Sequence, residues 1–213
     1  MAEAELLLDV RDRIATITFN RPEKLNAWTL PMDMEYRALM DELDKREDVR
    51  VIVITGAGRA FCSGADMGLL GTAQSGALDD GMDEYARQTV VREGVPADYQ
   101  KPYTYPAALS KPIVAAINGH AMGLGLVHAL FCDFRIASEE AKMSALFARR
   151  GLIAEHGLAW ILPRLIGMEP ALDLLLTGRT VDAFEALRLG LVGRVVPGEK
   201  LMEEAYALAN ELA

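Results

Sequence analysis

The sequence predicts an α/β fold in which helices cover a largely parallel sheet. Two apolar runs, residues 51–54 and 113–117, carry this prediction, because unbroken runs of this kind are typical of strands covered on both faces. Helical patterns alternate with such runs, and short glycine-containing turns separate them. This alternation is the pattern of crossover units, whose ligands usually bind beyond the carboxyl ends of the strands.

The remaining elements follow in chain order. Residues 14–19 alternate between apolar and polar side chains, as a half-buried strand does, and we expect residues 6–10 to pair with them. Thr29 and Pro31 can start a helix, and apolar residues then recur at helical spacing as far as Leu43. Further helical patterns lie at roughly 124–132, 158–166, 169–177, 182–189 and 199–212, and strand-like pieces lie at 134–137 and 191–196.

The segment between residues 68 and 106 lacks a clear pattern. It contains small, polar and scattered aromatic residues. A loop of this length inside a compact domain suggests a lid or a binding loop.

Composition excludes several classes of protein. The 213 residues include 22 basic and 31 acidic side chains, and the net charge of -9 argues against non-specific binding of nucleic acid or an anionic membrane. The two cysteines, Cys62 and Cys132, suggest neither a disulfide framework nor a zinc site. Without a secretory signal or a run long enough to cross a bilayer, we expect a soluble, cytoplasmic protein.

Two glycine-bearing loops, residues 56–67 and 118–126, each follow a buried strand and should face the same end of the sheet. The first amides of a helix have no internal partner, so such a junction can donate hydrogen bonds to developing negative charge, as in an oxyanion hole. The alternative is a pair of ordinary turns that need glycine for positive φ, and spacing alone favours it. The first loop has neither a P-loop ending nor a dinucleotide fingerprint.

Three segments carry a resemblance to a known family: residues 20–27 (NRPEKLNA), 58–66 (GRAFCSGAD) and 111–125 (KPIVAAINGHAMGLG). In order and spacing they closely resemble the signatures of the crotonase, or enoyl-CoA hydratase/isomerase, superfamily, and the resemblance covers nearly the whole chain. It implies a spiral core of repeated ββα units at residues 1–197, followed at 198–213 by the start of a C-terminal helical extension. It also implies assembly as a homotrimer, or as a hexamer of paired trimers.

The resemblance further implies an acyl-CoA substrate whose thioester oxygen is held by the backbone amides of Ala65 and Leu124. Such donors stabilise an enolate, and losing one costs roughly 3 kcal/mol of barrier. Coenzyme A enters as part of the substrate, so neither a separate cofactor nor a metal is expected. The family's CoA-contacting positions fall on Lys24, Leu25, Ala27, Ser63, Asp66 and Met67.

Three departures from the family pattern bear on the reaction. The chain stops after residues 201–213, where related proteins usually continue with further helices. The segment between Asp66 and Asn118 is longer than in a typical hydratase, which places extra lid sequence over the acyl pocket. Finally, the two glutamates of the hydratases align with Val127 and Phe147, and neither side chain can accept a proton.

Glu155 lies eight residues beyond Phe147, where several isomerases of the family carry their single acidic base, and it is our candidate catalytic acid/base. The alternative is that Glu155 only complements the N-terminus of the following helix. One carboxylate suffices for a 1,3-proton shift, which favours double-bond isomerisation over 2-enoyl-CoA hydration. His156 is a secondary candidate that could orient Glu155 or act as a base, whereas His120 and His128 are expected to be structural.

Two other functions stay open. One is hydrolysis of a carbon–carbon bond in a β-diketone, for which the histidines would matter. The other is a non-catalytic acyl-CoA-binding subunit, favoured by the missing hydratase glutamates and the short C-terminus. RNA binding is disfavoured by the acidic balance.

Overall fold

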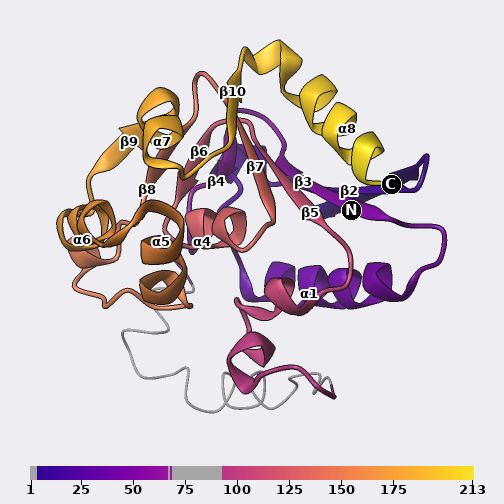
Figure 1. The fold of residues 1–213 in the computed structure, drawn as a ribbon, viewed down its shortest axis with the longest axis horizontal. Coiled ribbons are helices and arrows are strands. Elements are labelled where there is room, and N and C mark those ends of the chain that lie inside the picture. Colours follow the sequence, from indigo (N-terminus) through magenta and orange to yellow (C-terminus); the bar gives the residue numbers. More distant parts are fainter. Residues whose placement is uncertain (1–3, 67, 69–92) are drawn as a thin grey trace.

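A computed structural model of the chain describes residues 4–66, 68 and 93–213 (Figure 1). Met67 and most of the expected lid segment therefore lie outside the described residues. The described part of that segment contains two short 3-10 helices, η2 (Ala97–Gln100) and η3 (Tyr105–Ala108).

The strands form two sheets. The first contains, in spatial order, β1 (Leu6–Arg11), β2 (Ile14–Phe19), β3 (Val51–Gly56), β5 (Ile113–Ile117), β7 (Phe134–Ser138) and β10 (Arg194–Val196). The second contains β4 (Ala60–Cys62), β6 (His120–Met122), β8 (Lys142–Ser144) and β9 (Thr180–Asp182). Among the described strands, only the pairs β1–β2 and β8–β9 are antiparallel, so the expected largely parallel sheet is confirmed.

Helices occupy the positions that the sequence indicates, within a few residues. They are α1 (Leu30–Lys45), α4 (Leu124–Leu130), α5 (Leu158–Ile166), α6 (Met168–Thr177), α7 (Ala183–Leu189) and α8 (Leu201–Leu212), with short 3-10 helices η1 (Pro22–Lys24), η4 (Ala148–Arg150) and η5 (Gly198–Lys200). The succession of β5, β6 and α4 is one ββα unit of a spiral, and the expected α/β spiral fold is confirmed.

The central strands β3 and β5 of the six-stranded sheet are buried on both faces. Ile52 and Ile54 face the larger core, while Val51 and Val53 face a smaller core that α8 closes. Figure 1 shows α1 and α8 on opposite sides of this sheet. A strand with cores on both faces has no solvent side, which explains the unbroken apolar runs at residues 51–54 and 113–117.

The second sheet was not expected from the sequence. Its strands have three residues each, too few to establish a period of two, and β4 and β6 lie inside segments that we expected to be loops. The strand expected at 191–196 begins only at Arg194, because Leu191 and Val192 turn back to the carbonyl oxygen of Ala186 at the end of α7. Within the described residues, no helix combines the length and apolar character that a membrane span requires.

Candidate functional site

The two glycine-bearing loops are in direct contact. A β-carbon on Gly125 would stand 2.1 Å from the carbonyl oxygen of Cys62, and one on Gly64 would stand 2.9 Å from that of Met122. The same Gly64 position lies 3.8 Å from the amide nitrogen of Leu124. Gly64 also has a φ of +101°, so it serves both a left-handed turn and a close approach, whereas Gly125 serves the approach alone. The contact is therefore more than a pair of ordinary turns.

The backbone around Ala65 is held by Trp28. The N–H of Trp28 donates to the carbonyl oxygen of Gly64 at 2.8 Å, and the N–H of Asp66 donates to the carbonyl oxygen of Trp28 at 2.8 Å. The N–H of Ala65 lies between these two bonds, and it donates to no other described residue. The N–H of Leu124, at the first position of α4, likewise has no acceptor among the described residues. The structure thus brings two available amide donors into adjoining loops.

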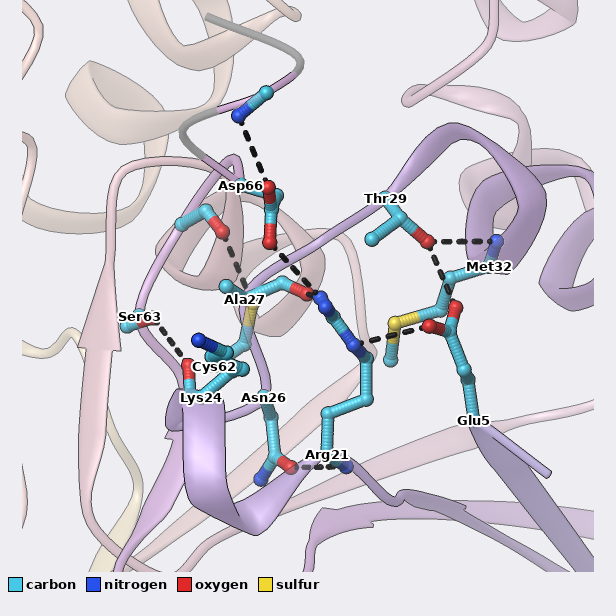
Figure 2. A network of polar contacts seen from close by, with 12 residues as sticks. Glu5, Arg21, Lys24, Asn26, Ala27, Thr29, Met32, Cys62, Ser63 and Asp66 are labelled. Atoms are coloured by element: carbon cyan, nitrogen blue, oxygen red, sulfur yellow. Dashed lines mark hydrogen bonds and ion pairs between the residues drawn. The ribbon is translucent and has the colours of Figure 1, made fainter. Parts of the chain in front are cut away.

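The turn after β2 lies against the first of these loops, as Figure 2 shows. The N–H of Ser63 donates to the carbonyl oxygen of Leu25 at 3.0 Å, and the Ser63 hydroxyl lies 3.4 Å from that of Lys24. Five of the six expected CoA-contacting residues therefore surround one junction, with Ala27 and Asp66 completing the set. Met67 lies outside the described residues.

Asn26 locks this turn. It is fully buried and left-handed, with a φ of +55°. Its side-chain amide donates to the carbonyl oxygens of Ala57 and Ala60, and its Oδ1 accepts from the N–H of Arg21 at 2.8 Å. Asparagine suits such a position because its short polar side chain offsets the cost of a left-handed backbone.

Arg21 is a residue of the site that our sequence reasoning did not single out, although it stands in the NRPEKLNA segment (Figure 2). Its guanidinium donates to the carbonyl oxygen of Ala27, and pairs with Asp66 at 3.2 Å and with Glu5 at 3.0 Å. A hydrogen bond from the N–H of Gly68, with Arg21, lowers the pKa of Asp66 below its usual value. Asp66 is therefore ionised at neutral pH and holds its loop onto the turn.

Glu155 and His156 lie between η4 and α5. The Glu155 carboxylate is 3.3 Å from Nε2 of His156, and burial lowers the pKa of His156 to about 4. The imidazole is therefore neutral at pH 7, and it can donate a hydrogen bond to the carboxylate from Nε2. The residue at the N-cap of α5 is Gly157, and no side chain among the described residues caps this helix. The structure thus gives Glu155 a partner other than the helix end.

Apolar side chains occupy the two positions that we expected to align with the hydratase glutamates. Val127 is fully buried and Phe147 is 8 % exposed. The Phe147 ring lies 6.0 Å from the ring of His156. The Phe147 position therefore lies near the pair formed by Glu155 and His156.

A layer of buried rings lies behind the first loop. The His128 ring lies 4.0 Å from the indole of Trp28 and 5.8 Å from the ring of Tyr103, and burial lowers the pKa of His128 to about 3. The indole Nε1 donates to Asp33 at 2.8 Å, and burial raises the pKa of Asp33 to about 7. We call the rings of Trp28, Tyr103 and His128, together with Asp33, which is hydrogen-bonded to the indole, the ring layer. It had no signal in the sequence, because its members come from separate parts of the chain.

Cys62 is unsuited to nucleophilic catalysis. Burial raises the pKa of its thiol to about 12, so the thiolate is absent at neutral pH. The described residues also contain no group of three or more histidine, cysteine, aspartate or glutamate side chains placed to hold a metal ion.

Comparisons with known proteins agree on one family. The model of the family described as enoyl-CoA hydratase/isomerase matches residues 9–213. A probable enoyl-CoA hydratase of Mycobacterium tuberculosis is 38% identical over 204 residues, which cover 95% of this chain and 69% of that protein. A probable enoyl-CoA hydratase of Rhizobium meliloti is 37% identical, over 100% of this chain and 77% of that protein.

Solved structures give the same result. The crystal structure of a putative enoyl-CoA hydratase from Streptomyces coelicolor superposes with a TM-score of 0.86 at 35% identity, over 99% of this chain and 73% of that one. A probable enoyl-CoA hydratase/isomerase from Mycobacterium abscessus superposes with a TM-score of 0.78 at 37% identity, over 98% of this chain and 75% of that one.

Proposed function

The chain belongs to the enoyl-CoA hydratase/isomerase family, and we therefore propose that it binds an acyl-CoA thioester and stabilises the enolate formed from it. The observation that supports this proposal is the contact between the two loops, together with the absence of an acceptor for the amides of Ala65 and Leu124 among the described residues. Two fixed amide donors stabilise the oxyanion more than the neutral thioester, and so lower the barrier to removing the α-proton.

We propose double-bond isomerisation as the reaction. The Glu155 carboxylate removes a proton from C2 of a 3-enoyl thioester, and the electron pair moves onto the thioester oxygen. The amides hold this dienolate while the same carboxyl group returns the proton to C4, which gives the 2-enoyl thioester. The apolar side chains of Val127 and Phe147 support this choice, because they leave Glu155 to act alone.

Hydration of a 2-enoyl-CoA is the second candidate. The relatives compared above are named enoyl-CoA hydratases, and this favours water addition. Glu155 would then activate a water molecule, with neutral His156 orienting the carboxylate through their 3.3 Å contact. Assembly as a trimer or hexamer, a cytoplasmic location and the absence of a separate cofactor stay predictions.

The experiment that tests these proposals follows purified protein with 2-enoyl-CoA and 3-enoyl-CoA substrates of several chain lengths. Product mass detects added water, and absorbance of the conjugated enone detects migration of the double bond. Glu155→Gln should lower kcat by roughly 10²–10⁴-fold, as expected for loss of a general acid–base group. The matched control is Glu211→Gln, which changes an exposed glutamate at the end of α8.

Each outcome has a distinct meaning. Migration without a mass change, lost in Glu155→Gln, supports isomerisation. Water addition would replace isomerisation by hydration. Binding of acyl-CoA without turnover would instead favour the non-catalytic subunit.

A further inference from the structure

A cavity of about 610 Å³ opens beside the candidate base. Its volume lies within the range usual for small-molecule sites. Five of the side chains that line it carry aromatic rings: Tyr99, Tyr103, Phe131, His156 and Trp160. They come from the η2–η3 region, the end of α4 and the start of α5.

The inner wall of the cavity adjoins the proposed reaction site. His156 lines the cavity, and its Nε2 is 3.3 Å from the Glu155 carboxylate. Tyr103 lines it as well, and its ring stands edge-on to His156 at 4.3 Å and lies 5.8 Å from His128. His128 in turn contacts Trp28, whose backbone holds the first loop. The contacts of Tyr103 with His128 and of His128 with Trp28 therefore link the wall of the cavity to the first loop.

The outer wall is formed by an indole that the protein itself orients. The guanidinium of Arg164 lies 4.1 Å from the centre of the Trp160 ring, and it donates to the Trp160 carbonyl oxygen at 2.9 Å. Tyr99 meets the indole edge-on at 5.7 Å. These contacts restrict the indole before any ligand arrives, which reduces the entropy lost on binding.

Resting on the proposed function, we propose that this cavity receives the distal part of the acyl chain and selects chains that end in an aromatic ring. Rings on several walls offer a flat guest both stacked and edge-to-face contacts, and these contacts add to the burial of apolar area. A flexible alkyl chain of equal carbon number gains only the burial of apolar area, without ring contacts, and it loses more rotational freedom on binding.

The test compares two CoA thioesters with twelve acyl carbons each, one ending in phenyl (6-phenylhexenoyl) and one unbranched (dodecenoyl), as 2-enoyl and 3-enoyl forms. We expect kcat/KM to favour the phenyl thioester by about tenfold in the wild type. Trp160→Leu should bring this ratio close to one, because leucine keeps apolar contact without a ring. The control is Tyr206→Leu on α8, across the six-stranded sheet, which should keep the wild-type ratio.

A binding measurement keeps the inference separate from the reaction. Saturated 6-phenylhexanoyl-CoA and dodecanoyl-CoA bind without turnover, and their Kd ratio should show the same preference and the same loss in Trp160→Leu. A preference in binding without turnover would overturn the proposed reaction and leave the aromatic site supported. Equal or alkyl-favouring ratios in the wild type would overturn the aromatic site, whatever the enzyme catalyses.

Discussion

Two adjoining regions of the site differ in the groups that form them. The region that would hold the thioester oxygen consists of backbone amides, glycines and a polar network centred on Arg21. The ring layer behind it consists of side chains packed against one another, with few hydrogen bonds. The backbone loops can approach each other closely because their glycines lack a β-carbon. The rings are instead held in place by the side chains packed around them. Adding a single carbon to a glycine of the first region should therefore sharply reduce catalysis. Substitutions in the ring layer should instead change stability according to the charge and volume of the new side chain.

The sharpest way to break the amide region is Gly125→Ala. The added carbon would meet the carbonyl oxygen of Cys62 at 2.1 Å and must push the loops apart, displacing the amide of Leu124. We expect kcat with an enoyl-CoA to fall by roughly 10²–10³-fold, the usual cost of losing one oxyanion donor.

The control for this change is Gly193→Ala. Its β-carbon would meet only the carbonyl oxygen of Arg135, at 3.7 Å, which is an ordinary contact. Circular dichroism and urea unfolding should show that both variants are folded. A folded Gly125→Ala variant with wild-type kcat would show that the close approach of the loops does not set the position of the amide.

The same contrast explains how far the sequence could lead. The glycines of the amide region and Asn26 stand in short continuous segments, and these segments carry the family resemblance even though Gly125 is required by contact with a distant loop. The family resemblance, the spiral fold and the residues around the first loop therefore followed from the sequence.

The ring layer could not be found in this way. Trp28, Tyr103 and His128 are distant along the chain, and nothing local distinguishes them from ordinary core residues. Asp33 is a charged residue, yet it is 3% exposed, because it lies on the buried face of α1 with Tyr36 and Met40. The three-residue strands of the second sheet could not be predicted for a related reason. They form by pairing with distant segments and are too short to show an alternating pattern.

Asp33→Asn tests how a buried carboxyl group in the ring layer affects the pH dependence of stability. Burial raises the pKa of Asp33 from 3.8 to about 7, against the opposing effects of its Trp28 hydrogen bond and of Arg37. A carboxyl whose pKa is higher in the folded state contributes stability that is present below about pH 4 and lost as the pH rises through 7. Between pH 5 and pH 8, the variant should therefore gain roughly 2.5 kcal/mol in free energy of unfolding relative to the wild type.

The buried His128 and the half-buried His156 act in the opposite direction. Burial lowers the pKa of His128 to about 3 and that of His156 to about 4. The stability that each neutral imidazole contributes to the folded protein is therefore lost as the pH falls below about 6.5. Asp33→Asn should thus make acid unfolding steeper. Urea unfolding at pH 5, 6, 7 and 8 measures the effect, with Asp9→Asn in the exposed hairpin as control. Parallel curves for Asp33→Asn and the wild type would mean that Asp33 is ionised in the folded protein across this range.

Arg21→Met tests the polar network that surrounds the amide region, and we expect the smallest effect from it. The guanidinium joins Asp66 in the first loop to Glu5, and Glu5 accepts a hydrogen bond at 2.8 Å from Thr29, the N-cap residue of α1. Its side chain is 15% exposed, so losing these partly buried contacts should lower the free energy of unfolding by about 1–2 kcal/mol. Looser anchoring of Asp66 should also raise KM for an enoyl-CoA several-fold while kcat changes less.

Arg46→Met is the matched control, because Arg46 pairs with Asp48 at the surface and far along the chain from the site. It should change neither KM nor stability measurably. The informative quantity is the split between KM and kcat in Arg21→Met. A loss confined to KM would mean that Trp28 alone keeps the Ala65 amide in place and that Arg21 only shapes the surface on which coenzyme A rests. A loss in kcat as large as that of Gly125→Ala would mean that the polar network, and not the close approach of the glycines, positions the donor.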